Sequence, residues 1–409
     1  MSTPLQGPYL MGLTPPFFPT AESVTNYGAI GDGLTDDTAA INNMLAYMTG
    51  NSAPASGGRN LKAPIFFPPG TYKISSDLVL QSAIQPVIMG YGATIKASGS
   101  AFTNSMLNLD GCYKGMVYGL TFIGDGTDQV NSAIKIDNST AGFQNTTGVR
   151  IQDVIIRNLK YVSGIDASGT GSRQLDGVQF DNILIAGQQA AGAWSNSGNW
   201  QNGLLLGNGT FANNYNHNAR GVSCSGHFVN YNVNVSSLSM NGGEPANGGT
   251  DFNILPNGPC TIECVQTQNC GQFFAVQGFS PTPVSFIDCL VKSNFINSPN
   301  GYVGTHIGGP LTLKNVSYAA CQVAGSGVYG GCLIHVTNDG SASRYATLIA
   351  QNVCASGLKT ATILPAAATG NANIVLENYM NYSPTTGNYT LTAGDILSYY
   401  TGTAWTTIA

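Results

Sequence analysis

A short pattern recurs along most of this 409-residue chain and limits the folds that it can adopt. Each copy has an apolar residue, any residue, a small or turn-prone residue and then an apolar strand. The central residues of the copies are Gly119, Asp153, Asn182, Asn232, Cys264, Asp288, Asn315, Asn352 and Asn378. They lie about 25–35 residues apart with occasional longer gaps, a spacing typical of solenoid proteins. We therefore expect stacked coils that share one apolar core.

The central residue of each copy is expected to form a bend, because Asn and Asp tolerate left-handed backbone and bond their own backbone. Asp153 and Asp288 are therefore assigned to bends rather than to chemistry. An antiparallel sandwich would instead give strands about 8–12 residues apart with two-residue hairpin signals, which are scarce here. The pattern favours one parallel β-helix coil per repeat.

A second set of strands follows the bends, at residues 132–137, 163–166, 202–206, 250–254, 272–276, 304–307 and 332–336. Side chains alternate between the two faces of a strand. Residues expected to point inward are Ile134, Ile136, Ile165, Phe252 and Ile254. Residues expected to point outward on one sheet are Lys135, Asp137, Asp166, Asp251, Asn253, His306 and His335.

Composition supports a β-rich solenoid. Charged residues make up only 9% of the chain and Gly is abundant, with 52 copies, whereas exposed helix faces are usually rich in Glu, Lys and Arg. The net charge of −5 comes without a basic run, so a nucleic-acid partner is not expected. No apolar stretch approaches the ~20 residues of a membrane span.

The nine cysteines lack metal-type spacing. Cys260, Cys264 and Cys270 are close together, but no histidine or second pair completes a zinc set. We expect buried thiols, with one or two disulfides as the alternative for an exported protein. No metal and no cofactor are expected.

The segment after residue 22 is expected to close one end of the solenoid. Thr35 or Asp36 is the expected N-cap of a helix whose apolar face is Ala39, Ile41, Leu45 and Met48. Such a helix would hide the open core and block end-to-end strand pairing. Asp32, Asp36 and Asp37 are interpreted as turn and cap residues, with a calcium site as the alternative.

Three blocks within this region, residues 23–42, 65–74 and 88–95, resemble the opening of the pectate-lyase superfamily, which polygalacturonase-like proteins and phage tailspikes share. The resemblance implies an all-β, single-stranded right-handed parallel β-helix of the pectin-lyase-like kind, and a polysaccharide substrate. The expected division is an N-terminal arm (1–22), first coils with the capping helix (23–110), a β-helix body (111–380) and a C-terminal strand or cap segment (381–409). Residues 394–405 resemble terminal modules of phage tail proteins, or simply close the last coil.

The motifs by which polygalacturonases of this fold catalyse hydrolysis are not intact here, so catalytic candidates come from the residues themselves. Glycoside hydrolysis needs two carboxyl groups at a suitable separation. The candidates are Asp137 with Asp166 on adjacent coils, Asp166 with Asp251 two spacings apart, and Glu244 in a loop before Asp251. The alternative for each is a solvated surface carboxylate.

The long gap between Asn182 and Asn232 is expected to hold a binding loop, because long loops on rigid scaffolds often carry function. It contains Trp194, Trp200, Tyr215 and His217, and packing of the loop on its own coil is the alternative. Asn253, His306 and His335 are the expected sugar contacts on the sheet.

The resemblance to phage tailspikes thus implies a tailspike-like protein that binds and depolymerises bacterial surface polysaccharide, as a glycosidase or a lyase. It would be a homotrimer, attached to a virion tail through residues 1–22 or extracellular, since residues 1–6 show no signal peptide. The alternatives are a non-enzymatic polysaccharide-binding adhesin or tail fibre, and a secreted pectinolytic enzyme.

Overall fold

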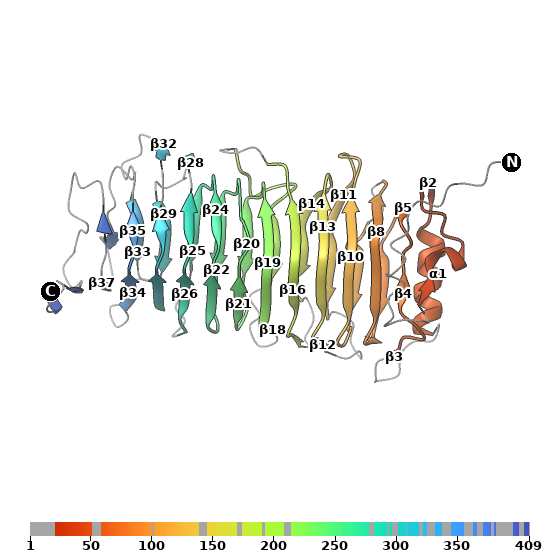
Figure 1. Ribbon diagram of the computed structural model, residues 1–409, viewed down its shortest axis with the longest axis horizontal. Coiled ribbons are helices and arrows are strands. Elements are labelled where there is room, and N and C mark those ends of the chain that lie inside the picture. Colours follow the sequence, from red (N-terminus) through yellow and green to blue (C-terminus); the bar gives the residue numbers. More distant parts are fainter. Residues whose placement is uncertain are drawn as a thin grey trace, which may run out of the picture.

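The computed structural model shows one long stack of parallel β-coils, with the α-helix α1 (Thr38–Thr49) at its N-terminal end (Figure 1). The structure describes residues 21–50, 59–99, 102–138, 145–169, 174–189, 193–207, 214–277, 282–292, 294–296, 302–307, 309–318, 322–324, 332–337, 345–355, 363–365, 371–377, 380–381, 396–400 and 405–408. The expected arm at residues 1–20 lies outside these ranges. The all-β, right-handed parallel β-helix expected from the sequence is confirmed.

One side of the stack, from β6 to β36, is an eleven-stranded parallel sheet, here called the front sheet. Its strands are β6 (Leu78–Gln81), β9 (Ser105–Asp110), β11 (Gln129–Asp137), β14 (Lys160–Ala167), β17 (Asn202–Leu206), β20 (Val229–Val233), β22 (Thr250–Ile254), β25 (Gln272–Val276), β29 (Tyr302–Ile307), β33 (Cys332–Thr337) and β36 (Ile363–Pro365). All seven expected segments of the second set lie in it, so that prediction is confirmed.

The rest of the coil forms a seventeen-stranded sheet, the back sheet. Its strands are β1 (Glu22–Ser23), β2 (Asp32–Asp36), β4 (Ile65–Phe66), β5 (Gly70–Ile74), β8 (Val87–Ala97), β10 (Met116–Ile123), β13 (Arg150–Arg157), β16 (Gln179–Ala186), β19 (His217–Ser225), β21 (Leu238–Asn241), β23 (Cys260–Glu263), β26 (Val284–Ile287), β30 (Gly309–Lys314), β34 (Tyr345–Gln351), β37 (Asn371–Glu377), β39 (Ile396–Tyr400) and β40 (Trp405–Ile408).

Smaller sheets complete the corners. They contain β3 (Arg59–Asn60) with β7 (Ala83–Ile84), β12 (Thr146–Thr147) with β15 (Leu175–Asp176) and β18 (Asn214–Tyr215), β24 (Gln266–Gln268) with β27 (Leu290–Lys292), β31 (Ser317–Tyr318), β35 (Cys354–Ala355) and β38 (Met380–Asn381), and β28 (Asn294–Ile296) with β32 (Gln322–Ala324).

The bends of the back sheet carry the expected left-handed backbone. Positive φ values occur at Gly119, Asp153, Asn182, Cys264, Asp288, Asn315 and Asn352. Their side chains bond along the stack, since Asn315 Nδ2 donates to Asp288 Oδ1 over 2.8 Å and Asn352 Nδ2 donates to Asn315 Oδ1 over 2.9 Å. The assignment of Asp153 and Asp288 to bends is confirmed, while Asn378 lies outside the described residues.

The assignment of Asn232 to a bend is wrong. Asn232 lies in β20 of the front sheet, where its Cα pairs with those of Leu205 and Asn253. The bends of these coils are Gly221 and Gly242, which supply positive φ without an Asn or Asp side chain. The expected gap of about 50 residues therefore contains a bend that the pattern missed.

The N-terminal end is closed by α1 (Thr38–Thr49), which follows the short 3-10 helix η1 (Val24–Tyr27). Ile41, Leu45 and Met48 are buried as expected, but Ala39 is exposed and Met44 is buried in its place. The N-cap position is Asp37, not Thr35 or Asp36.

The aspartates before α1 bind nearby backbone and hydroxyl groups. Asp37 accepts hydrogen bonds from Ile30 N and Gly31 N, and Asp36 accepts bonds from Thr38 N and Ser75 Oγ. Asp32 closes its own turn by accepting bonds from the backbone of the next residues. These carboxylates are therefore structural.

The core is continuous through the coils and most aromatic in the middle. Phe252 stacks on Tyr231 with ring centroids 4.8 Å apart, and its edge meets Phe286 at 5.6 Å. Five of the seven cysteines in the described residues are buried thiols, as expected, whereas Cys264 is exposed. No described helix is long and apolar enough to cross a membrane.

The other end departs from the parallel pattern. β39 continues the stack in parallel with β37, and β40 then pairs with β39 antiparallel. Neither the boundary at residue 381 nor the resemblance to tail modules is tested by this pairing.

Candidate functional site

Polar groups gather on the outer face of the front sheet near its N-terminal end. Ile134 and Ile136 of β11 are fully buried in the core, so the intervening Lys135 and the following Asp137 point to the opposite face. The Cα of Lys135 pairs with Asn108 on one side and Asp166 on the other, and Asp137 pairs with Asp110. We call Asn108, Asp110, Lys135, Asp137 and Asp166 the carboxylate face.

The contacts of the carboxylate face are short and specific. Lys135 Nζ lies 2.8 Å from Asp137 Oδ2, while the backbone N–H of Asn138 donates to Asp137 Oδ1 over 2.8 Å. Asp166 Oδ1 accepts a bond from Ser168 N over 2.9 Å. Asp110 and Asp137 are each 2% exposed, whereas Asp166 is more accessible. The structure thus brings Asp137 and Asp166 to one face, as predicted.

The front sheet continues with an amide ladder on the same outer face. Asn232 Nδ2 donates to Asn202 Oδ1 and Asn253 Nδ2 donates to Asn232 Oδ1, both over 3.0 Å. Gln277 Nε2 donates to Asn253 Oδ1 over 2.7 Å. Asn253 is therefore on the predicted face and only partly buried.

The prediction that Asp251 points outward is wrong. Asp251 and its neighbour Phe252 are both 0% exposed. Thr250 pairs with Gln272 and Phe252 with Phe274, while Asp251 has no Cα partner in the ladder. Strict alternation fails at this point of the strand, so Asp251 enters the interior and cannot act with Asp166.

Asp251 ends a buried chain of hydrogen bonds across the coils. Asn230 Nδ2 donates to Asp251 Oδ1 over 2.7 Å, so the Oδ1 atom of Asn230 accepts from His227 Nδ1 over 3.0 Å. The other ring nitrogen, His227 Nε2, then accepts from the hydroxyl of Tyr161 over 2.8 Å. The chain fixes one neutral tautomer of His227.

Burial dominates the protonation of this chain. It raises the pKa of Asp251 to about 7, against opposing hydrogen bonds from Cys270 and Asn230. It lowers the pKa of His227 to about 4, although the bond to Asn230 acts in the opposite direction. The uncharged forms are favoured because the core solvates charge poorly.

Two predicted histidine contacts are also wrong. His217 is 1% exposed and His306 is 0% exposed, and burial lowers the pKa of each to about 4. His306 Nε2 lies 3.0 Å from the carbonyl oxygen of Gly309, and Thr305, not His306, is opposite His335. The side chains of Tyr215 and His335 lie outside the described residues.

The loop expected to bind ligand, which contains Trp194 and Trp200, packs against its own and neighbouring coils. Trp194 Nε1 donates to the carbonyl oxygen of Asn247 over 2.8 Å, and Trp200 Nε1 donates to that of Leu159 over 2.9 Å. The ring of Trp194 lies beside Gly249 and Gly271, just before β22 and β25. Trp200 is thus a packing residue, while Trp194 borders the front sheet and stays partly exposed.

Glu244 is exposed, and its Oε1 accepts a hydrogen bond from Gln268 Nε2 over 2.5 Å. Its backbone N–H bonds Ser223 Oγ on the preceding back-sheet coil. It lies in the segment after β21, which leaves the back sheet, and nothing brings it onto the carboxylate face.

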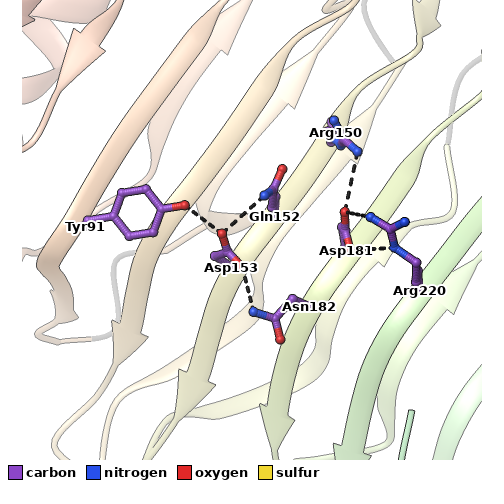
Figure 2. A network of polar contacts seen from close by, with 7 residues as sticks. All are labelled: Tyr91, Arg150, Gln152, Asp153, Asp181, Asn182 and Arg220. Atoms are coloured by element: carbon purple, nitrogen blue, oxygen red, sulfur yellow. Dashed lines mark hydrogen bonds and ion pairs between the residues drawn. The ribbon is translucent and has the colours of Figure 1, made fainter. Parts of the chain in front are cut away.

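The back sheet holds a second polar network, shown in Figure 2. Asp153 accepts hydrogen bonds from Tyr91 Oη and Asn182 Nδ2, both over 2.6 Å, and from Gln152 Nε2 over 3.3 Å. The next coil carries Asp181, which is bound by two arginines. Arg220 donates to both of its oxygens, from Nε over 3.1 Å and from Nη2 over 2.6 Å, and Arg150 Nη2 lies 3.4 Å away.

These bonds hold both carboxyls in the charged form. Hydrogen bonds from Arg220 lower the pKa of Asp181, and bonds from Tyr91 and Asn182 lower that of Asp153 despite partial burial. Asp153 continues the bend ladder, so the network joins successive coils. Its arginines were missed in the sequence because their only signal is strand register, which pairs Asp181 with Arg220.

No cluster of three or more metal-ligating side chains occurs in the part of the chain that the structure describes.

Comparison with known proteins agrees with this architecture. The sequence model of the family "Rhamnogalacturonase A/epimerase, pectate lyase-like" matches residues 21–272, more than half of the chain. The chain belongs to this family. Its fold is similar to that of the tailspike of Acinetobacter phage vb_AbaP_AS12, with a TM-score of 0.61 and 9% sequence identity over 95% of this chain and 64% of the tailspike.

Two curated fungal relatives are more similar in sequence but much longer. A protein named non-secreted LysM effector LysM19 of Penicillium expansum is 27% identical over 210 residues, 48% of this chain and 14% of its own length. A probable glucan endo-1,3-beta-glucosidase of Arthroderma benhamiae is 23% identical over 337 residues, 76% of this chain and 33% of its own length. The chain thus spans a third or less of these relatives.

Proposed function

We propose that this protein binds a polysaccharide along the outer face of the front sheet and cleaves its glycosidic bonds with Asp137 and Asp166. The observation that carries the proposal is the carboxylate face, where successive coils place these two carboxyls on one side of one sheet. The neighbouring amide ladder supplies groups that hydrogen-bond sugar hydroxyls.

The register gives the Cα atoms of the pair a separation compatible with hydrolysis. Asp166 lies opposite Lys135, so it is one strand and two residues away from Asp137. A strand spacing of ~4.8 Å and a rise of ~3.3 Å per residue give a Cα separation of about 8 Å. Inverting glycosidases hold their carboxyls roughly 6.5–9.5 Å apart, which leaves room for a water molecule.

The proposed chemistry is single displacement. One carboxyl gives its proton to the leaving oxygen while the other takes a proton from the attacking water, so the glycosidic C–O bond breaks and a hemiacetal hydroxyl forms. Asp137 fits the base, because the ammonium group of Lys135, 2.8 Å away, stabilises a carboxylate there. The role of the acid then falls to Asp166, the other carboxyl of the pair.

The comparisons support the class of substrate. The matching family is named for a rhamnogalacturonase and an epimerase, and one relative is named a glucanase. The finer proposal of a tailspike-like depolymerase of bacterial surface polysaccharide rests on likeness of fold to a phage tailspike. A homotrimer and tail attachment through residues 1–22 belong to this finer proposal.

The experiment is to incubate the protein with a soluble β-1,3-glucan, a rhamnogalacturonan and bacterial capsular polysaccharides, and to measure new reducing ends. Asp137→Asn and Asp166→Asn should each abolish cleavage, whereas Glu263→Gln on the back sheet should leave it intact. NMR of the first product should show inversion at the anomeric carbon. Release of reducing ends that survives both front-sheet substitutions would refute the assignment.

The second candidate is binding without cleavage. It is favoured by the burial of Asp137, which is 2% exposed and paired with Lys135 as a structural ion pair would be. A protein of this kind would bind the same polymers and release no reducing ends from any of them.

A further inference from the structure

Tyr91, in strand β8 of the back sheet, exposes its aromatic ring. Tyr91 is 52% exposed. A Cβ atom built on Gly119 of the next coil would lie 2.8 Å from Cγ and Cδ1 of Tyr91 and 3.0 Å from Cδ2. Because these distances are nearly equal, the ring lies with one face over Gly119, while about half of the surface of Tyr91 stays exposed.

The ring is also held in place. Its hydroxyl donates to Asp153 Oδ2 over 2.6 Å, and the ring of Tyr118 lies 5.6 Å away at an angle of 57°. Burial raises the pKa of Tyr91 to about 12, so the hydroxyl stays a donor. A ring fixed in this way loses little conformational entropy when a ligand stacks on it.

Polar side chains lie beyond the hydroxyl of Tyr91, as Figure 2 shows. Gln152 and Asn182 each give one amide hydrogen-bond donor to Asp153, and their amide oxygens accept no bond in the described part of the chain. The side chain of Arg220 is 70% exposed, and its Nη1 donors have no partner among the described residues. Acceptors and donors of this planar kind suit sugar hydroxyls.

We propose that Tyr91 and Tyr118, here the tyrosine platform, form a second glycan-binding site with Gln152, Asn182 and Arg220. The inference rests on the proposed polysaccharide function but uses none of its residues. The row runs from Tyr118 through Gln152 and Asp181 to Arg220 on successive strands. Three strand spacings of ~4.8 Å give about 14 Å, a length that a short oligosaccharide covers.

The charged residues beside the tyrosine platform indicate which class of glycan it would bind. Asp153 and Asp181 balance Arg150 and Arg220, so the charges of these four residues of the network cancel. A neutral glycan is therefore expected to bind there, and its affinity should not depend on salt. The same coils carry the carboxylate face on the front sheet, so the platform would hold one part of a polymer while another part lies at the proposed cleavage site.

The test uses the full chain with Asp137→Asn and Asp166→Asn, so that bound polymer is not cleaved. Isothermal titration measures the Kd for a soluble β-1,3-glucan, with polygalacturonate as the anionic comparison. Adding Tyr91→Ala should weaken the β-1,3-glucan Kd about tenfold, the loss of a stacking contact of ~1.4 kcal/mol. Tyr91→Phe keeps the ring and should stay within about twofold.

The matched control is Tyr47→Ala, which removes a tyrosine of similar exposure, 49%, from the capping helix. It should leave the Kd unchanged, and circular dichroism should show that each variant folds. An unchanged Kd for Tyr91→Ala, or binding of polygalacturonate alone, overturns the platform and leaves the cleavage proposal standing. Binding that depends on Tyr91 in a protein that cleaves nothing supports the platform and refutes the cleavage.

Failure to bind either polymer overturns both proposals. If Tyr91→Ala loses self-association while its Kd stays unchanged, Tyr91 forms a contact between copies of the chain and the platform proposal is wrong.

Discussion

The buried carboxyl of Asp251 should make the stability of the protein depend on pH. Its pKa is about 7 in the folded chain and close to ~3.9 in an unfolded one. As pH rises above about 4, the unfolded state loses this proton first, so the free energy of unfolding falls until the folded state also ionises near pH 7. The full loss is about 4 kcal/mol, from roughly three pKa units at 1.36 kcal/mol each.

Asp251→Asn removes the ionisation and keeps an oxygen that can accept the bond from Asn230 Nδ2. Between pH 5 and pH 8 the wild-type chain should therefore lose about 3 kcal/mol more than the variant. At pH 8 the variant should be the more stable protein. The buried histidines, whose pKa values are lowered to about 4, act in the opposite direction below pH 6.5, but they are common to both chains and cancel in the difference.

The assay is equilibrium urea unfolding followed by tryptophan fluorescence at several pH values from 5 to 8. The matched control is Glu244→Gln, which makes the same change of charge at an exposed carboxyl and should leave the pH dependence as in the wild type. Parallel pH profiles for wild type and Asp251→Asn would refute the reasoning, because they would mean that Asp251 ionises in the folded chain as easily as in water.

Other substitutions test the packing and the ladders, each by the free energy of unfolding. Phe252→Ala empties the centre of the aromatic core and should cost about 3–5 kcal/mol; a cost below 1 kcal/mol would contradict the packing. Asn315→Ala removes a bend side chain that bonds both neighbouring coils and places alanine at a φ of 54°, so we expect a loss of about 1–3 kcal/mol, whereas Asn315→Gly should cost less. Arg220→Ala removes an exposed ion pair and should cost under ~1 kcal/mol, and a larger loss would show that the network of Figure 2 stabilises the stack more than its exposure implies.

The sequence predicted the stack and most of one sheet because both depend on short-range patterns. The alternation in β11 placed Ile134 and Ile136 in the core and Lys135 and Asp137 outside. The same rule failed at Asp251, where two consecutive residues enter the interior. The alternation rule assumes a regularly pleated strand. Nothing in the sequence Thr-Asp-Phe-Asn-Ile indicates that the pleat is irregular at Asp251.

The bends show the same limit. Asn and Asp at Asp153, Asn182 and Asn315 were recognisable because their side chains favour left-handed backbone. Gly221 and Gly242 adopt the same left-handed backbone without a side chain that marks them. They cannot be told apart among 52 glycines, so the pattern assigned the bend to Asn232. The arginine pair at Asp181 depends on register between strands that are 29 or more residues apart, which no local pattern records.

Because the fold is a stack of repeated coils, the protein can differ in length by whole coils. The strands of each coil pair with those of the adjacent coils. The family match ends at residue 272, while parallel pairing continues as far as β39. The carboxylate face and the tyrosine platform both lie on coils before that limit. C-terminal coils can therefore be added or removed during evolution while the geometry of both proposed sites stays unchanged.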